Sequence, residues 1–445
     1  MPTIAFYRSQ FRASPNHRHL ITSTGLPFFW LADRMHMLLR HLQRPDIDRY
    51  VQTRAAQRFS VMQMSALPGP DAMTVPNAYG LLPFNDGDVT QPVEGYFAHL
   101  DYFVLRANLL GMAVALEIAD AGIVGSAITE ENAVGFANYL SNRFQEQAVI
   151  WVLGSGDAPE DAQRQAIWSQ IGQALKTNTK GRHLIAYLPS RSATAGASWC
   201  QGESWLDIAL QRSGPAYNPL AWRAVEAGYI ATPERPVLDG GPCAEDQPTI
   251  AGEEDGRLSA QQIRRLVYTS VFAGGCGYTY RNHSVECCHR VSDTVDHART
   301  PWHDALFDPA AEELHFLRLL VESRPFQVRV PDQLLVANQA SNPAHQPLGT
   351  RADDDDLGGD CGSYAFIYSP DGSPVTVDLT RLSGSMVVAA WFDPRSGRGR
   401  WLGQFPVRGS RVFTPPSADD WVLVLDDASR NYPPVGLGSD RGMSI

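Results

Sequence analysis

The sequence is poor in cysteine and has none of the spacings that organise cysteines into a framework. Its six cysteines stand at positions 200, 243, 276, 287, 288 and 361 and form no C-x-x-C pair. A disulfide scaffold or a zinc ribbon needs regular pairs, so we expect neither. Cys287, Cys288 and His289 form a cluster of soft ligands, but without a second ligand pair a structural role is favoured over a metal site. We therefore expect no cofactor.

An excess of positive charge and long apolar runs are missing too. The 445 residues carry a formal net charge of -11, whereas binding to a polyanion needs clustered Lys and Arg. No apolar run approaches the roughly 18 to 20 residues of a membrane span, and the first residues lack the pattern of a signal peptide. We expect a soluble protein without nucleic-acid or membrane partners. It is either cytoplasmic or exported with its signal removed, and the sequence leaves its oligomeric state open.

Three catalytic or cofactor motifs are also absent. No G-x-G-x-x-G follows the first apolar segment, which disfavours a doubly wound dinucleotide-binding sheet. The G-x-S-x-G elbow of serine hydrolases and the H-E-x-x-H of zinc proteases do not occur. Gly154, Ser155 and Gly156 follow an apolar segment, but they are typical of a tight turn that presents Asp157.

Eight short apolar segments, each ending in polar or glycine residues, are what the sequence does contain. They cover residues 27–33, 60–67, 112–119, 148–156, 183–190, 206–213, 236–242 and 275–282. Helical patterns lie between them, among others at 45–58, 93–110, 130–145, 159–176, 219–230 and 259–273. Eight alternations of buried strand and helix over about 300 residues predict a (β/α)8 barrel, and the strand ends at its mouth then mark the active site.

The barrel is expected to have flanking parts on both sides. Residues 1–26 form a leader in which 11–25 make a hairpin that closes the bottom of the barrel, residues 27–325 form the barrel, and residues 326–445 form a second domain. The polar stretch 338–360, with four successive aspartates at 353–356, indicates a loop rather than a calcium site. Several short strand patterns after residue 363 predict a small antiparallel β-sandwich.

Carboxylates and aromatic residues stand where the predicted strands end. The carboxylates are Asp33, Glu117, Asp120, Asp157, Asp239, Glu245 and Asp246, and the other polar or aromatic residues are Trp30, Trp151, Tyr187, Tyr280, Asn282 and His283. A carboxylate buried without a partner is costly, so each belongs either to a site or to an ion pair. Several paired carboxylates at one mouth favour a glycosidase, in which one carboxyl protonates the leaving oxygen and another attacks or activates water.

Long ordered segments then resemble one family. PFFWLAD (27–33), NAYGLLPF (77–84), ITEENA (128–133), IWVLGSGD (150–157), RPVLDGGP (235–242), SVFAGGCGYTY (270–280) and SRPF (323–326) resemble glycoside hydrolase family 140, the apiosidase-like barrels. The tail, with SYAFIYSPDGSPVTVDL, AWFDPRSG and FTPP, looks like the collagen-binding-type β-sandwich that follows such barrels. The resemblance implies a carbohydrate substrate, with apiose glycosides of pectic side chains as the default and a furanoside favoured.

The resemblance also implies two catalytic positions. Asp157 matches the general acid/base after the fourth strand, whereas the nucleophile of the Leu-Asp-Gly-Glu-Pro pattern falls on Gly241, which has no side chain. Three alternatives follow: an enzyme inactivated at position 241, which we favour, a glycosidase that uses Asp239 or Glu245 instead, or a natural carbohydrate-binding protein without activity. A carboxylate at 241 would give a retaining enzyme if it lay roughly 5 to 5.5 Å from Asp157.

The remaining candidates are expected to bind the sugar. Asp33, Glu117 and Asp239 can accept charge-assisted hydrogen bonds from hydroxyl groups, although an ion pair with an arginine such as Arg34 is the alternative for Asp33 and Asp239. Further candidates at the strand ends are Trp30, Tyr187, Tyr280, Asn282 and His283. Tyr280 and His283 could instead orient the nucleophile, and a structural hydrogen bond is the more common role of a lone histidine.

Overall fold

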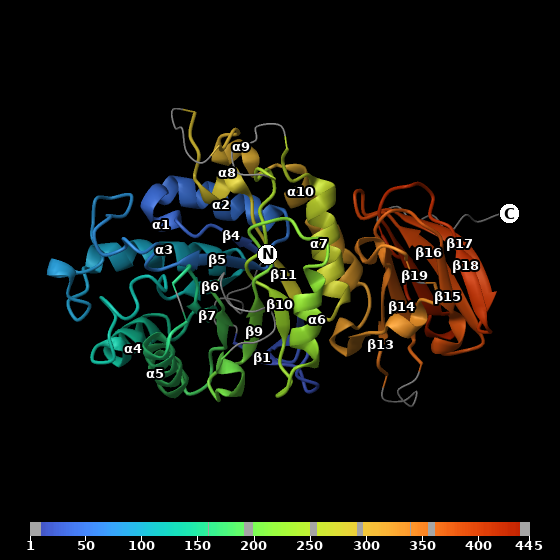
Figure 1. Ribbon diagram of the computed structural model, residues 1–445, viewed down its shortest axis with the longest axis horizontal. Coiled ribbons are helices and arrows are strands. Elements are labelled where there is room, and N and C mark those ends of the chain that lie inside the picture. The colour runs from blue at the N-terminus through green and yellow to red at the C-terminus, as the bar shows by residue number, and fades with distance from the viewer. Residues whose placement is uncertain are drawn as a thin grey trace. The chain divides into compact units, whose positions relative to one another are not determined.

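Eight parallel strands close into a barrel, as the sequence predicts. The structure is a computed structural model that describes residues 10–158, 160–190, 199–249, 256–291, 297–338, 340–354 and 361–436. The barrel strands are β4 (Trp30–Arg34), β5 (Val61–Ser65), β6 (Ala113–Glu117), β7 (Val149–Gly154), β8 (Ile185–Leu188), β9 (Ile208–Gln211), β10 (Val237–Asp239) and β11 (Gly277–Tyr280). They pair in chain order, and β11 closes the ring against β4 with Tyr280 opposite Asp33 (Figure 1). Seven lie within the predicted segments, and β4 extends one residue beyond its segment, to Arg34.

Helices occur between the strands close to the predicted residues. The predicted ones are α2 (Arg44–Ala56), α3 (Glu94–Leu109), α4 (Ala133–Arg143), α5 (Ala162–Asn178), α6 (Trp222–Ile230) and α7 (Ala260–Phe272). Those not predicted are α1 (Leu38–His41), α8 (His283–Glu286), α9 (Trp302–Ala305) and α10 (Pro309–Glu322). A capping box of Ser259 and Gln262 starts α7 by satisfying the free N–H groups of its first turn.

In the part of the chain that the structure describes, no helix combines the length and apolar character needed to cross a membrane.

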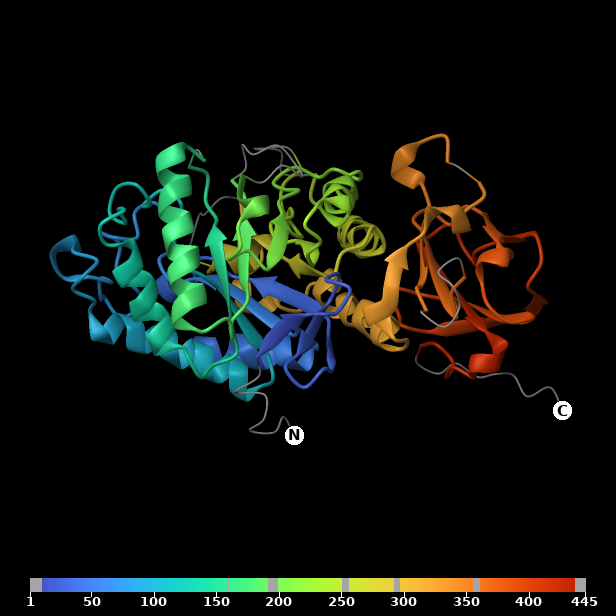
Figure 2. The ribbon, with the colours of Figure 1, turned by 90° about the horizontal axis from the view of Figure 1, so that it is seen from below.

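A small N-terminal sheet packs on the barrel interior. Strands β1 (Phe11–Ala13), β2 (Leu20–Thr22) and β3 (Pro27–Phe28) pair antiparallel and appear in blue in Figure 2. Phe11, Leu20 and Phe28 share one apolar cluster with Val61, Ala113 and other residues that begin the barrel strands. The predicted hairpin is therefore present, and it packs at the end of the barrel where the strands begin.

The contacts between residues divide the chain into two compact units. The first comprises Met1–Tyr217, Ala227–Leu258 and Cys276–Asp308 and holds all eight barrel strands. The second comprises Asn218–Glu226, Ser259–Gly275 and Pro309–Ile445, so α7 and α10 group with the C-terminal strands. The boundary predicted between residues 325 and 326 stays a prediction.

The second unit contains the predicted antiparallel sandwich. The larger sheet has six strands in the order β12 (Arg329–Pro331), β13 (Leu348–Ala352), β14 (Tyr364–Ser369), β19 (Trp421–Asp427), β16 (Met386–Phe392) and β17 (Gly399–Pro406). The smaller sheet consists of β15 (Val375–Asp378) and β18 (Ser410–Phe413). Val377, Trp391 and Leu423 belong to the shared core. The prediction of a continuous loop over 338–360 was wrong, because β13 lies within it; residues 339 and 355–360 lie outside the described residues.

Strand β17, at one edge of the six-stranded sheet, contains an irregularity. Its register against β16 shifts between Ala389 and Ala390, because Ala390 pairs with Trp401 and Ala389 pairs with Gly403. Gly403 has φ of +133°, a backbone conformation that residues with a side chain rarely adopt. The extra residue forms a β-bulge, which bends the strand and increases its twist.

Candidate active site

A cavity of about 580 Å³ opens where the barrel strands end. It is lined by Arg34, His36, Met37, His41, Gly69, Pro70, Asp120, Gly156, Asp157, Arg212, Arg281, Glu286, Cys287, Cys288 and Arg290. These residues end β4 or follow β5, β6, β7, β9 and β11, so several separate strands contribute to one mouth. Its size is that of a small-molecule site. Three carboxylates, Asp120, Asp157 and Glu286, face the same space.

Asp157 reaches this cavity on a turn that requires glycine. Gly154, Ser155 and Gly156 have φ values of +78°, +72° and +86°, three left-handed residues in succession. A Cβ on Gly154 would lie 2.1 Å from the carbonyl oxygen of Leu188, and one on Gly156 would lie 2.7 Å from Asp120 Oδ1. The turn leaves Asp157 exposed at the cavity, in the place expected for a general acid/base.

Asp120 is a second carboxylate beside this turn. Its side chain packs against Gly156, and its Oδ1 accepts a hydrogen bond of 2.7 Å from the backbone N–H of Gly122. Burial raises the pKa of Asp120, and the negative charges of Glu117 and Asp157 act in the same direction. A carboxyl group that holds its proton longer than usual is suited to proton transfer.

Glu117 lies beneath the cavity at the centre of a hydrogen-bonded network. Arg34 donates to both of its oxygens, from Nε at 2.6 Å and from Nη2 at 3.0 Å. Gln63 Nε2 and Ser155 Oγ donate to it at 2.8 and 2.7 Å, and His36 Nδ1 lies 2.9 Å away. Burial opposes ionisation, but Arg34 and His36 outweigh it and hold the pKa of Glu117 well below its usual range. Glu117 is fully buried, so it supports the Ser155 turn rather than reaching a sugar.

Glu286 is a cavity carboxylate that the sequence reasoning missed. It ends the one-turn helix α8, and its Oε1 accepts a hydrogen bond of 2.8 Å from Arg34 Nη1. Arg281 Nε donates to its Oε2 at 2.9 Å. Despite burial, the two guanidinium groups lower the pKa of Glu286. The only sequence feature that could have indicated Glu286 is its position, about one helical turn after the last barrel strand.

Gly241 is buried beside Arg212, and it is not among the residues that line the cavity. A Cβ at this position would lie 3.0 Å from Arg212 Cγ and 3.4 Å from Leu188 Cδ1. Arg212 itself lines the cavity, and its Nε donates to the carbonyl of Pro189 at 2.7 Å. The stem of Arg212 would have to move by a few tenths of an ångström to make room for a Cβ at position 241.

The two alternative nucleophiles lie outside the cavity lining. Asp239 is 2% exposed and accepts hydrogen bonds from the Ser213 hydroxyl and from the backbone N–H of Gly241, the latter at 3.2 Å. Glu245 is 3% exposed and accepts a 2.5 Å hydrogen bond from the Tyr280 hydroxyl. Neither carboxylate is placed to attack a sugar in the cavity.

Burial of Asp239 has a measurable consequence for stability. It raises the pKa of Asp239 to about 6, so the folded protein keeps a proton that the unfolded chain releases near pH 4. The free energy of unfolding should therefore fall as the pH rises from about 4 to about 6, by about 3 kcal/mol, and then level off. Asp239→Asn should remove this loss. Urea unfolding of both proteins at pH 4, 5 and 7 measures the difference, and parallel pH profiles would contradict it.

Three of the predicted sugar-binding residues have structural partners instead. Asp33 accepts hydrogen bonds from Arg54 Nε at 2.5 Å and from the Tyr50 hydroxyl at 2.8 Å, so the alternative of an ion pair applies, with Arg54 rather than Arg34. Trp30 is fully buried in the barrel and donates to Thr279 Oγ1 at 3.2 Å. Tyr187 is 2% exposed and donates to Glu160 at 3.1 Å.

The three candidates from the eighth strand end are also absent from the cavity lining. Tyr280 is fully buried against Glu245. Asn282 caps α8 by accepting from the N–H of Val285, and it donates to Asp308 Oδ2 at 2.7 Å. His283 donates its backbone N–H to the carbonyl of Glu245 at 2.9 Å. Tyr280 and Asn282 are therefore buried supports of the last strand, contrary to the expected contact with a sugar, whereas the role expected of His283 stays a prediction. Among the described residues, no group of three His, Cys, Asp or Glu side chains could hold a metal ion.

Comparisons with known proteins find an apiosidase-like family model and similar structures of glycoside hydrolases. A family model for an apiosidase-like catalytic domain matches residues 14–328, and one described as a putative collagen-binding domain of a collagenase matches residues 330–426. A solved glycoside hydrolase is 27% identical with a TM-score of 0.86, over 96% of this chain and 98% of its own. A glycoside hydrolase family 5 protein from Bacteroides vulgatus ATCC 8482 is 26% identical with a TM-score of 0.87, over 96% of each chain. No curated protein matches the sequence.

Proposed function

The chain belongs to the apiosidase-like family of glycoside hydrolases, and we propose that its barrel-mouth cavity binds a glycoside with Asp157 as the general acid/base. The observation that carries this proposal is the exposed Asp157 on a glycine turn at the strand-end cavity, which Arg212, the neighbour of position 241, also lines. In this arrangement Asp157 protonates the glycosidic oxygen as the bond to the leaving group breaks.

The second carboxylate of the family mechanism is missing at position 241. In a retaining glycosidase that carboxylate attacks the anomeric carbon, and Asp157 then deprotonates the water that releases the sugar. Gly241 has no side chain with which to make this attack. We therefore propose a chain inactivated at its nucleophile position, with the rest of the site intact. Burial of Asp239 and Glu245 argues against either of them as a replacement.

The supporting network explains how the site stays ordered without substrate. Ser155 donates to Glu117, and Arg34 connects Glu117 to Glu286. The turn that presents Asp157 is thus fixed by a buried ion pair. Preorganisation of this kind keeps an acid in its reactive position and avoids a cost of ordering during the reaction.

The proposed substrate is a furanoside from a plant or microbial polysaccharide side chain, with a pectic apioside as the first compound to test. Membership of glycoside hydrolase family 140 is part of this proposal. A non-catalytic carbohydrate-binding protein is the second candidate, and the glycine at position 241 is the observation that favours it.

A substrate screen tests the proposal. The protein and its Gly241→Glu variant are incubated with aryl apiosides, aryl arabinofuranosides, and arabinan and pectic oligosaccharides, and released sugar is measured. We expect product from the variant. Binding of an oligosaccharide without hydrolysis by either protein would favour the second candidate, and absence of both binding and hydrolysis would contradict the proposal.

A further inference from the structure

A second cavity lies in the C-terminal unit, on the face of the six-stranded sheet that points away from the sandwich core. The register of β16, β17 and β19 places Val388 opposite Gln404 and Asp426, and Ala390 opposite Trp401. Their neighbours Val387, Ala389 and Trp391 belong to the core on the other face. The small side chains of Val388 and Ala390 and the adjacent Gly399 form the floor of a hollow of about 70 Å³.

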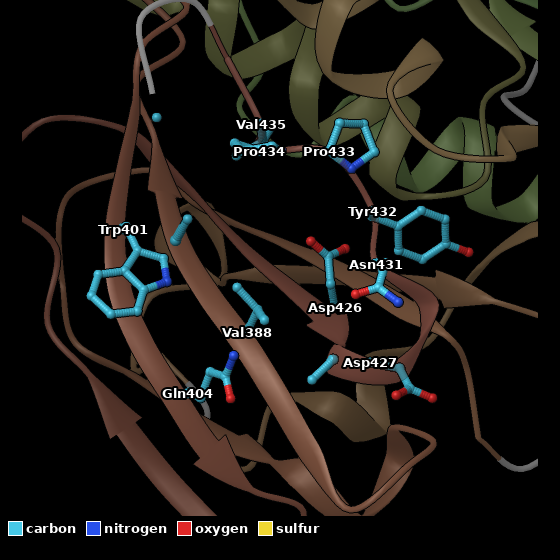
Figure 3. A pocket seen from close by; sticks show the side chains of 13 residues that line it. Val388, Trp401, Gln404, Asp426, Asp427, Asn431, Tyr432, Pro433, Pro434 and Val435 are labelled. Carbon is cyan, nitrogen blue, oxygen red and sulfur yellow. The ribbon is translucent and has the colours of Figure 1, made fainter. Parts of the chain in front are cut away.

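The walls of this hollow are the ring of Trp401 and the segment 431–435, which contains two prolines. Trp401, on β17, is 49% exposed, and Figure 3 shows its indole across the hollow from residues 431–435. That segment is fixed in place: the Tyr432 hydroxyl lies 3.0 Å from Ser363 Oγ, and the Arg324 guanidinium lies 4.8 Å from the Tyr432 ring. An exposed indole beside a hollow offers an apolar ring face on which a ligand can pack.

The polar groups around Trp401 fall into two sets, charged groups that already have partners and neutral groups that have none among the described residues. Both charged ones are already paired: Asp426 accepts two hydrogen bonds from Arg324 at 2.8 and 2.7 Å, and Asp427 accepts from Ser383 at 2.5 Å. By contrast, within the described part of the chain the Gln404 amide and the Trp401 indole N–H make no hydrogen bond. The groups left for a ligand are therefore neutral donors and acceptors next to an apolar ring face.

We propose that this hollow, formed by Val388, Ala390, Gly399, Trp401 and Gln404, binds a neutral carbohydrate separately from the barrel mouth. The apolar face of a sugar ring packs on the indole, and its hydroxyl groups exchange hydrogen bonds with the Gln404 amide. A neutral glycan fits better than an anion because the two carboxylates of the hollow already accept hydrogen bonds from other side chains, and no Lys or Arg is among its lining residues. The choice of a glycan over another polar ligand rests on the glycoside hydrolase family of the chain.

Affinity gel electrophoresis of the full chain tests this site, with arabinan, galactan or xylan cast in the gel. We expect at least one polysaccharide to retard the protein, and Trp401→Ala and Gln404→Ala to weaken the binding, the former by about tenfold or more. Phe307→Ala, which removes an aromatic side chain of similar exposure (57%) from the other unit, should bind as the unchanged protein does. Circular dichroism melting confirms that the variants fold.

Two results would overturn the proposal. Equal retardation of Trp401→Ala and the unchanged protein would assign all binding to the barrel. A lack of retardation in every gel would exclude a glycan site, and if light scattering then showed a dimer that Trp401→Ala dissociates, the hollow would be an interface between two copies of the chain. The Asp157→Asn protein should still bind the polysaccharide that Trp401→Ala binds weakly. This result would show that the site is separate from the proposed catalytic one.

Discussion

The Gly241→Glu protein should hydrolyse a suitable aryl furanoside at least about 10³-fold faster than the protein with glycine. The change introduces a carboxylate at the nucleophile position that the family resemblance implies, while Asp157 and its supporting turn are unaltered. The new Cβ would lie 3.0 Å from Arg212 Cγ, so the stem of that flexible side chain must shift by a few tenths of an ångström to admit it. Initial rates of aryl-group release at pH 6 to 7 provide the measurement.

Matched variants separate the carboxylate from other effects of the substitution. Gly241→Gln has nearly the same shape and should stay at the rate of the starting protein. Asp157→Asn in the Gly241→Glu background should lose about 10²- to 10⁴-fold, the usual contribution of a general acid. Proton NMR of the first-formed anomer should show retention. Activity in Gly241→Gln equal to that of Gly241→Glu would contradict the assignment of position 241.

Arg34→Met should lower the free energy of unfolding by about 3 to 5 kcal/mol at pH 7. Arg34 makes a two-point ion pair with Glu117, which has no exposed surface, and methionine would leave that buried charge with fewer partners. Because the pKa of Glu117 is lowered in the folded state, the stabilisation is present above about pH 4 and is lost as the pH falls further. Urea unfolding at pH 7 and pH 3 measures both effects.

Arg290→Met is the control for this measurement. Arg290 lines the same cavity, but its side chain is 51% exposed, so its removal should change stability by no more than about 0.5 kcal/mol. If Arg34→Met lost no more stability than Arg290→Met, the buried network would not be the support that the geometry indicates.

Much of the fold could be predicted from the sequence because buried parallel strands are nearly continuous apolar runs. IWVLG before Asp157 is one example, and all eight barrel segments were found in this way. Strand β13 was missed because its five residues, LGTRA, contain a glycine and lie among turn-forming residues. Helix α10 was missed although Leu314, Leu317 and Val321 repeat at helical spacing on its buried side.

The site was harder to predict than the fold. Asp157 was placed correctly at the mouth because a glycine turn after a strand has a recognisable pattern. Trp30 and Tyr280 were misplaced because side chains alternate between the two faces of a strand, and the stagger between strands decides which residues reach the mouth. Glu286 was missed because it lies on a one-turn helix, which has no periodic signal.

The bulge at Gly403 has a consequence for how this protein behaves when concentrated. Open sheet edges are where separate molecules join strand to strand, and a regular ladder of free N–H and C=O groups promotes such growth. On β17 the bulge interrupts that ladder, and the opposite edge, β12, is three residues long and ends in Pro331. Both features disfavour extension of the six-stranded sheet into a neighbouring molecule, and so oppose fibre-like aggregation through this sheet even with Trp401 on its surface.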